Sequence, residues 1–215
     1  MRVNPFEDVL AFLTRGGITT VIFWLLTVGS VAIAVRVYVM STTDRRRFDL
    51  ADYALRFFVG CMWWQQTLWK LPPYYTDQPQ EPFGTSGLSF WMTEMTKWSA
   101  FPIHGRLVKD VILEHFYLFA PLVYGIEVLI GVSLMWGVFT RVGALLGALM
   151  AINLWLGLYR SPAEWPWTYF FLIVIQFAYT LYPPGRSLGL DALLRSRASR
   201  SDRASWSSRV IRIAT

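Results

Sequence analysis

A single carboxylate, Glu127, lies in the middle of a long apolar stretch and is the residue most suited to chemistry. Its neighbours are Ile126 and Val128, and residues 116–140 carry no other charge. A carboxylate inside a membrane is costly. It usually faces the interior of a helix bundle, where it marks a ligand pathway, a proton site or a polar network. Glu127 is therefore our candidate catalytic residue, with a structural hydrogen bond between two helices as the alternative.

Polar and aromatic side chains on other apolar stretches can share an interior with Glu127. A quinone headgroup needs hydrogen-bond donors for its carbonyl oxygens and an aromatic surface for its ring. The residues that we propose for this cofactor, or for a polar interior, are Trp63, Gln66, Lys70, Asn153 and Gln176. The alternative stays open, because tryptophans gather at bilayer interfaces without a ligand and buried amides also pair helices.

The chain lacks the residues that would hold several other cofactors. The chain has two histidines, His104 and His115, and one cysteine, Cys61. We expect both histidines outside the bundle or at its outer edge, which excludes a bis-histidine haem within the membrane. No C-x-x-C occurs, which excludes an iron–sulfur cluster and a c-type haem attachment. Asp110 and Glu114 precede His115 in a weak metal-like pattern that is more typical of a solvated helix start. We therefore assign no metal site and no covalently bound cofactor.

Five long, nearly charge-free apolar stretches must position these residues. They cover residues 17–40, 53–71, 116–140, 142–159 and 165–182. A helix rises about 1.5 Å per residue, so about 20 apolar residues cross a hydrocarbon core of about 30 Å. Backbone amides inside a bilayer find no water, so each stretch must be helical. The sequence thus predicts an all-α, polytopic membrane protein with five spans.

Basic residues are divided unequally between the two sides of such a membrane. They cluster around residues 41–52, at Arg141 and after the last span. If the N-terminus is outside, thirteen of the 20 Lys and Arg residues lie on the other side. The positive-inside rule then predicts a cytoplasmic C-terminus in a bacterial-type inner membrane. The net charge of +6 is a topology signal, and we expect no nucleic-acid partner.

The connection 72–115 is longer than a compact domain usually needs, and we expect it to lie outside. Residues 86–98 carry apolar side chains every three to four positions, which predicts a short helix covering the outer end of the bundle. The tail 193–215 is basic, with hydrophobic residues at helical spacing near its end. This pattern is typical of contact with anionic lipids, and a disordered tail is the alternative.

Small residues in the fourth stretch predict close helix packing. Gly143 and Gly147 form a G-x-x-x-G pattern. Glycines at this spacing allow two helix backbones to approach each other closely. We favour packing inside the bundle over a dimer interface.

Short charged motifs follow a distinctive order along the apolar stretches. An R-x-x-x-G begins at Arg56, and a helix-ending K-L begins at Lys70. The mid-helix Glu127 is followed by L-x-x-G-x-x-x-R, which ends at Arg141. A G-R-x-x-x-x-D ending closes at Asp191. This order resembles the DoxX/DoxD family of small membrane proteins.

The resemblance covers residues 50–192 and implies a four-helix transmembrane bundle made of the last four spans. Residues 1–49, with an extra N-terminal transmembrane helix, and the cytoplasmic tail 193–215 are then additions. DoxD-type members are subunits of a thiosulfate:quinone oxidoreductase and work with a separate small partner. The positions that the resemblance marks are Arg56, Lys70, Glu127 and Arg141.

Three functions stay open. The chain has no electron carrier of its own, so our leading hypothesis is a quinone-facing membrane subunit of a redox-linked complex that needs a partner for chemistry. The first alternative is a non-catalytic scaffold subunit of a larger respiratory or photosynthetic assembly. The second is a small-molecule transporter with Glu127 as its proton site. The expected partners are membrane lipids and other subunits, and whether the chain is an enzyme is left open.

Overall fold

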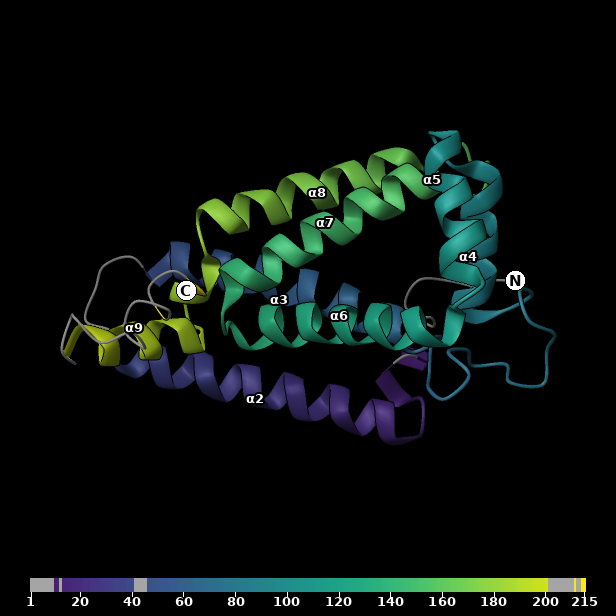
Figure 1. The fold of residues 1–215 in the computed structure, drawn as a ribbon. Helices are drawn as coiled ribbons and strands as arrows, with labels where there is room; N and C mark the ends of the chain where they lie inside the picture. Colours follow the sequence, from purple (N-terminus) through teal and green to yellow (C-terminus); the bar gives the residue numbers. More distant parts are fainter. Residues whose placement is uncertain (1–9, 12, 41–45, 201–210, 212–213) are drawn as a thin grey trace.

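The computed structural model describes residues 10–11, 13–40, 46–200, 211 and 214–215. This part of the chain contains eight α-helices, α2 to α9, and no β-strand, which confirms the predicted all-α class. Five helices run lengthwise and α4 crosses one end (Figure 1). The lengthwise helices are α2 (Ile18–Met40), α3 (Arg46–Thr67), α6 (Phe116–Trp136), α7 (Thr140–Leu158) and α8 (Pro166–Leu181).

Three of the described helices, α2, α6 and α7, are long and apolar enough to cross a membrane. Helix α8 is apolar but has 16 residues, because Pro183 and Pro184 follow it and cannot continue a helix. Helix α3 has 22 residues, but its first turns carry Arg46, Asp49 and Asp52. The structure therefore supports three of the five predicted spans by length and composition.

Two tightly packed helix pairs build the bundle: α3 with α6, and α7 with α8. Helix α6 ends at Trp136 and is followed by Gly137, whose φ of 66° lies in the left-handed region that a glycine adopts readily at a helix end. Figure 1 shows the two pairs close together near α9 (Leu190–Arg200) and further apart near α4 (Gly87–Trp98). We call these the α9 end and the α4 end.

Glycines of α7 allow the close packing of this helix against its neighbours. A Cβ at Gly143 would collide with the side chain of Ser133, and a Cβ at Gly147 would collide with the side chain of Gln176. The predicted packing of the G-x-x-x-G pattern inside the bundle is therefore confirmed. It places Gln176 of α8 directly against α7.

Asp191 of α9 caps the start of α7 at the α9 end. Its Oδ1 accepts a hydrogen bond from the backbone N–H of Phe139 at 2.7 Å. Its Oδ2 accepts from the backbone N–H and the hydroxyl of Thr140 at 3.0 and 2.6 Å. Burial raises the pKa of Asp191 above its usual range, and the hydrogen bonds from Thr140 oppose that rise. A carboxylate here satisfies N–H groups that have no partner within the helix.

Arg56 of α3 pairs with carbonyl groups at the C-terminal end of α6. Its side chain is fully buried, and Nη1 donates to the carbonyl oxygens of Leu134 and Met135 in the last turn of α6. The last carbonyls of a helix have no partner within the helix, so a buried cation is favourable there. Arg56 and Asp191 together join α3, α6, α7 and α9, while η2 (Pro184–Arg186) packs beside them.

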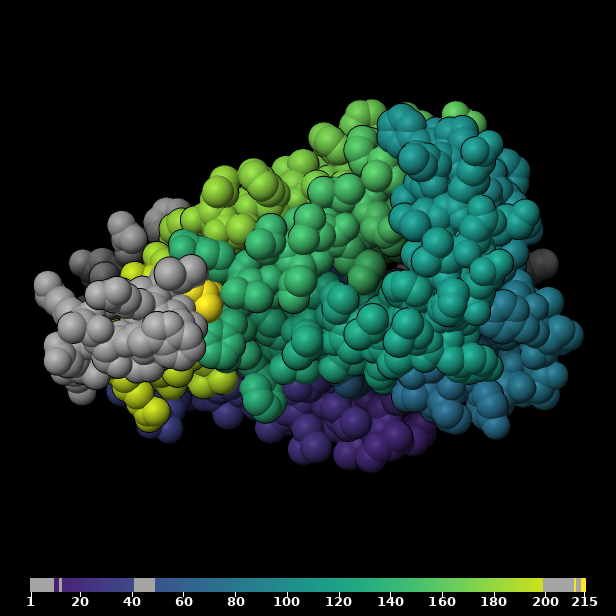
Figure 2. Space-filling view, viewed as in Figure 1, coloured from purple at the N-terminus to yellow at the C-terminus, as the bar shows by residue number. Residues whose placement is uncertain are grey.

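The α4 end is closed by the connection between α3 and α6. The predicted helix at residues 86–98 is confirmed as α4, and α5 (Pro102–Leu107) and the π-helical turn η1 (Val108–Leu113) follow it. Backbone hydrogen bonds, of 2.7 Å from Ala100 to Leu156 and 3.0 Å from Arg160 to Trp98, fix α4 to the end of α7. The space-filling view shows this segment covering the end of the bundle (Figure 2).

Candidate ligand-binding pocket

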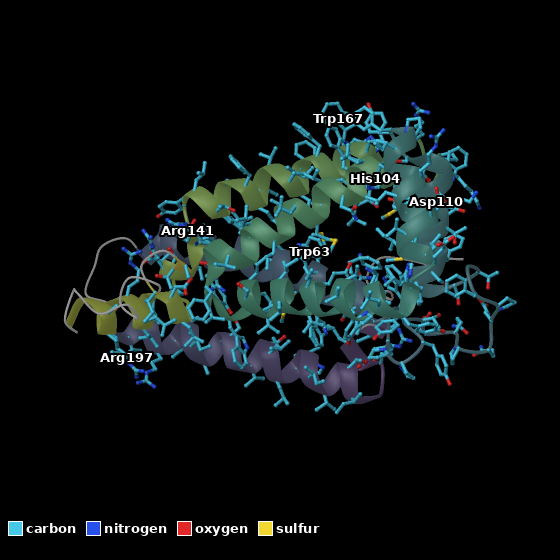
Figure 3. All side chains as sticks on the ribbon, in the orientation of Figure 1. Trp63, His104, Asp110, Arg141, Trp167 and Arg197 are labelled. Carbon is cyan, nitrogen blue, oxygen red and sulfur yellow. The ribbon has the colours of Figure 1, made fainter. Side chains whose placement is uncertain are left out.

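A pocket of about 520 Å³ lies between the two helix pairs, toward the α4 end. Figure 3 places Trp63 between Arg141, at the α9 end, and His104, at the α4 end. The pocket is lined from α3, the turn that follows it, α4, α6, α7, α8 and the connection between α7 and α8. Its volume falls within the range of sites that hold small organic ligands.

One wall of the pocket contains a buried ion pair between Lys70 and Glu127. Lys70 Nζ donates to Glu127 Oε1 at 2.5 Å, and the two side chains are 4% and 1% exposed. The same Nζ lies 4.3 Å from the centroid of the Trp69 ring, which favours the cation. Glu127 Oε2 has no hydrogen-bond partner among the described residues. The carboxylate therefore keeps one unused acceptor at a pocket wall.

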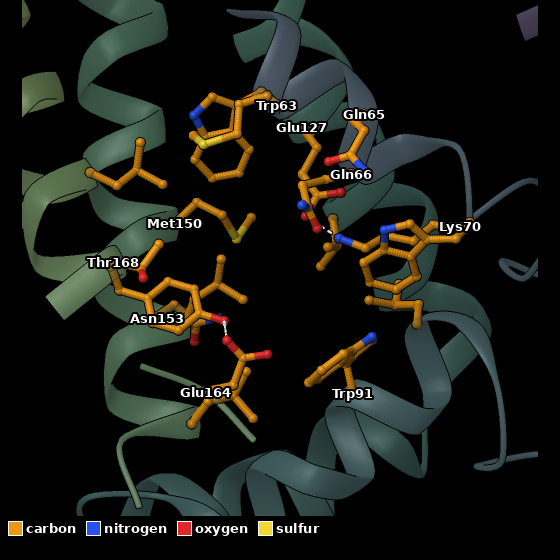
Figure 4. Close-up of a pocket in the computed structure, with 18 of the residues that line it drawn as sticks. Trp63, Gln65, Gln66, Lys70, Trp91, Glu127, Met150, Asn153, Glu164 and Thr168 are labelled. Atoms are coloured by element: carbon orange, nitrogen blue, oxygen red, sulfur yellow. Dashed lines mark hydrogen bonds and ion pairs between the residues drawn. The ribbon is translucent and has the colours of Figure 1, made fainter. Parts of the chain in front are cut away.

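The opposite wall carries a second polar group of residues, from α7, α8 and the connection between them. The hydroxyl of Tyr169 donates to Glu164 Oε2 at 3.0 Å. Asn153 Oδ1 lies 3.1 Å from His104 Nε2. Figure 4 shows Asn153, Glu164 and Thr168 facing Lys70 across the pocket. A ligand in this space meets polar groups on two opposite sides.

Aromatic and aliphatic side chains fill the space between the polar walls. Trp63 and Trp91 lie at opposite ends of the pocket as Figure 4 draws it. Met150 and Leu154 add flexible apolar surface from α7. Such surfaces suit a flat ring. A polar ligand binds here only if its carbonyl or hydroxyl groups are hydrogen-bonded, because burying them unpaired is costly.

The lining of the pocket reaches the protein surface at α3 and α8. Gln65 on α3 and Thr168 on α8 both line the pocket and are exposed, whereas Lys70 and Glu127 are buried. A ligand would therefore enter from the side of the bundle and reach the ion pair at the depth of the pocket.

The structure brings together Glu127 and four of the five residues predicted to bind a cofactor. Trp63, Gln66, Lys70 and Asn153 line the pocket. Gln176 is fully buried but lies behind Trp63, whose Nε1 donates to Gln176 Oε1 at 3.2 Å. The catalytic and cofactor-binding roles of these residues stay predictions.

Sequence reasoning missed the partners of two pocket residues. His104 was expected outside the bundle, yet it contacts Asn153, 49 positions away in the chain. Tyr169 and Glu164 were not considered, because neither stands out within its segment. The contact of His104 with Asn153 depends on how α5 lies against α7, so no local pattern indicates it. The pair of Tyr169 and Glu164 joins residues five positions apart and was open to sequence reasoning. The part of the chain that the structure describes holds no group of three or more metal-ligating side chains.

The DoxX family model matches residues 51–160, just over half of the chain. This chain belongs to the DoxX family. The match begins in α3 and ends just after α7, so it includes both members of the Lys70–Glu127 pair and stops before α8. No curated protein and no solved structure matches the chain. Membership of the family and the long apolar helices make this a multi-pass membrane protein.

Proposed function

We propose that this DoxX-family protein binds a quinone in the pocket and is the quinone-facing subunit of a redox complex. The opposed polar walls carry the proposal. A para-quinone has two carbonyl oxygens on opposite edges of a flat ring, so it needs donors on two sides. Lys70 and Gln66 offer N–H donors on one wall, and Asn153 offers an amide on the other.

The apolar parts of the pocket also suit a quinone. Trp63, Trp69 and Trp91 line it, and their rings can contact the faces or edges of a quinone ring. The opening between Gln65 and Thr168 is on the side of the bundle. In a bilayer a lipid-soluble ligand can enter there while its hydrocarbon tail stays among the lipid chains.

The chemistry of the proposed complex needs a partner. The sequence offers no ligands for a haem in the membrane or an iron–sulfur cluster, so electrons would come from another subunit. The residues of this chain then bind and orient the quinone. The Lys70–Glu127 pair supplies a fixed cation and a carboxylate at one edge of the ring.

Quinone binding by the purified protein in lipid nanodiscs tests the proposal. A short-tail quinone should quench tryptophan fluorescence saturably, because three tryptophans line the pocket. Thr168→Trp fills the opening and should weaken binding by about tenfold or more, as expected for a clash at a close-packed site. Phe177→Trp adds the same side chain at an exposed position of α8 outside the pocket lining and should leave binding unchanged. Absence of saturable quenching in the unaltered protein would rule out the quinone site.

We also propose that the chain spans the membrane five times, with the N-terminus outside and the C-terminus in the cytoplasm of a bacterial-type cell. The apolar character of α8 and the distribution of Lys and Arg support this topology. A reporter fused after Thr215 should be active only in the cytoplasm, and one inserted between Gln78 and Gln80 only outside. A C-terminal reporter that is labelled from outside intact cells would overturn the proposed orientation and the outer position of α4.

A scaffold role has one observation in its favour. Helix α2 touches the bundle through few polar contacts, among them Ser30 Oγ donating to the carbonyl of Met135 at 2.7 Å. Its other face exposes large apolar side chains, including Val21, Leu25 and Val28. Lipid covers such a face equally well. Co-purification of a stable membrane subunit that is lost when Leu25 is replaced by arginine would favour the scaffold, whereas unchanged co-purification would favour lipid.

A further inference from the structure

His104 reaches the pocket wall from outside the pocket. Its Nε2 lies 3.1 Å from Asn153 Oδ1, and its Nδ1 lies 2.9 Å from Ser99 Oγ. Ser99 stands at the C-terminal end of α4, His104 lies in α5, and Asn153 lies in α7. One line of hydrogen bonds therefore connects the segment that closes the α4 end to the amide that lines the pocket.

The imidazole ring of His104 packs against Gly157 of α7. A Cβ at Gly157 would lie 3.2 Å from His104 Cε1 and 2.7 Å from Met95 Cγ. Glycine at this position leaves room for the ring beside the helix, one turn beyond Asn153. Figure 3 shows His104 at this end of the bundle beside α7. The position of His104 is thus set by packing as well as by its hydrogen bonds.

These contacts favour one tautomer of a neutral His104. The amide oxygen of Asn153 faces His104 and can only accept, so in this arrangement Nε2 is the donor. In a neutral imidazole Nδ1 then accepts. The Ser99 hydroxyl lies 2.9 Å from Nδ1 and 3.3 Å from the carbonyl oxygen of Leu156, and its single proton is assigned to the shorter contact, with Nδ1. Because Oδ1 is held by His104, the two N–H groups of the Asn153 amide are left for the pocket.

We propose that His104 is a positioning residue that holds the Asn153 amide with its N–H groups toward the ligand. The amide then favours a carbonyl oxygen over a hydroxyl group, because it offers no acceptor for the hydroxyl proton. The inference rests on the proposed quinone function and adds that His104 sets the preference of this amide for quinone over quinol. It assigns a function to a residue that lines no part of the pocket.

The tautomer of His104 can be measured without any ligand. The chain has two histidines, so ¹⁵N-histidine labelling gives two sets of ring signals, and His115→Gln assigns them. We expect His104 to be protonated on Nε2, and Asn153→Leu to shift that signal while leaving His115 unchanged. Protonation of neutral His104 on Nδ1 would overturn the inference, because Asn153 would then have to turn its oxygen toward the pocket.

Ligand selectivity is the second measurement, made on quinone and quinol with the same ring. His104→Gln keeps an N–H donor near the position of Nε2 and should hold both affinities within about twofold of the unaltered protein. His104→Leu removes the donor, so quinone affinity should fall by about tenfold, the usual effect of one lost buried hydrogen bond. The ratio of quinone to quinol affinity should fall with it, since the freed amide can turn its oxygen inward.

His115→Gln is the matched control. The ring Nδ1 of His115 lies 3.0 Å from the backbone carbonyl of Val111, and the residue is exposed and lines no part of the pocket, so both affinities should stay unchanged. A folded His104→Leu protein with an unaltered affinity ratio would overturn the inference. If the unaltered protein binds neither ligand, the proposed quinone function fails, and the tautomer still decides whether His104 orients Asn153.

Discussion

Replacing Lys70 with methionine should lower the free energy of unfolding by about 3–5 kcal/mol, the usual cost of leaving a buried charge without its partner. The carboxylate of Glu127 is 1% exposed and accepts its one hydrogen bond from Lys70. Methionine has a similar length and an apolar stem, so it fills the space but cannot donate. Chemical unfolding in detergent micelles, followed by tryptophan fluorescence, measures the loss.

Two controls separate burial of the charge from general damage. Lys97→Met removes an exposed lysine that pairs with Glu94 at 2.7 Å, and exposed pairs contribute only about 0–1 kcal/mol. The double variant Lys70→Met with Glu127→Met removes both buried charges, and such replacements are often close to neutral. It should therefore recover most of the stability. It should also bind quinone about tenfold more weakly or worse, because the charged donor of Lys70 to the quinone carbonyl is lost. A Lys70→Met loss no larger than that of Lys97→Met would contradict the buried pair.

The helices were predictable because a bilayer allows few alternatives. A long stretch without charges must form a helix in lipid, and the predicted stretch 116–140 contains α6 from its first residue. The prediction extends past the end of α6 because hydropathy does not report backbone conformation. Gly137 turns the chain through a left-handed φ of 66°, and α7 begins at Thr140.

The pairing inside the pocket was less predictable. Sequence reasoning selected Lys70 and Glu127 separately, from the cost of a charge in an apolar stretch and from the family resemblance. Their contact joins residues 57 positions apart and depends on how the turn after α3 lies against α6. Gln176 shows the same limit. It is buried, as expected for an amide in an apolar helix. Gly147 leaves room for its side chain against α7, where it lies behind Trp63. The contact of His104 with Asn153 could not be predicted without knowing that α5 folds over the end of α7.

Asp191 provides the second large expected effect. Asp191→Ala should lower the free energy of unfolding by about 2–4 kcal/mol, because it removes a helix cap and leaves buried N–H groups unpaired. The carboxylate accepts three hydrogen bonds, two from the backbone N–H groups of Phe139 and Thr140 and one from the Thr140 hydroxyl. In the described part of the chain these N–H groups have no other acceptor. Unfolding in detergent micelles measures the change.

The position of Asp191 makes its effect on stability separable from any effect on the ligand. It lies at the α9 end and lines no part of the pocket, so the folded Asp191→Ala protein should bind quinone as well as the unaltered protein. Asp191→Asn keeps one acceptor oxygen and should lose about half as much stability. Asp110→Ala, at an exposed position on η1 at the α4 end, should change stability by less than about 0.5 kcal/mol. If Asp191→Ala matched the Asp110 control, the junction of α7 and α9 would not depend on this carboxylate, and the motif that ends at Asp191 would need another explanation.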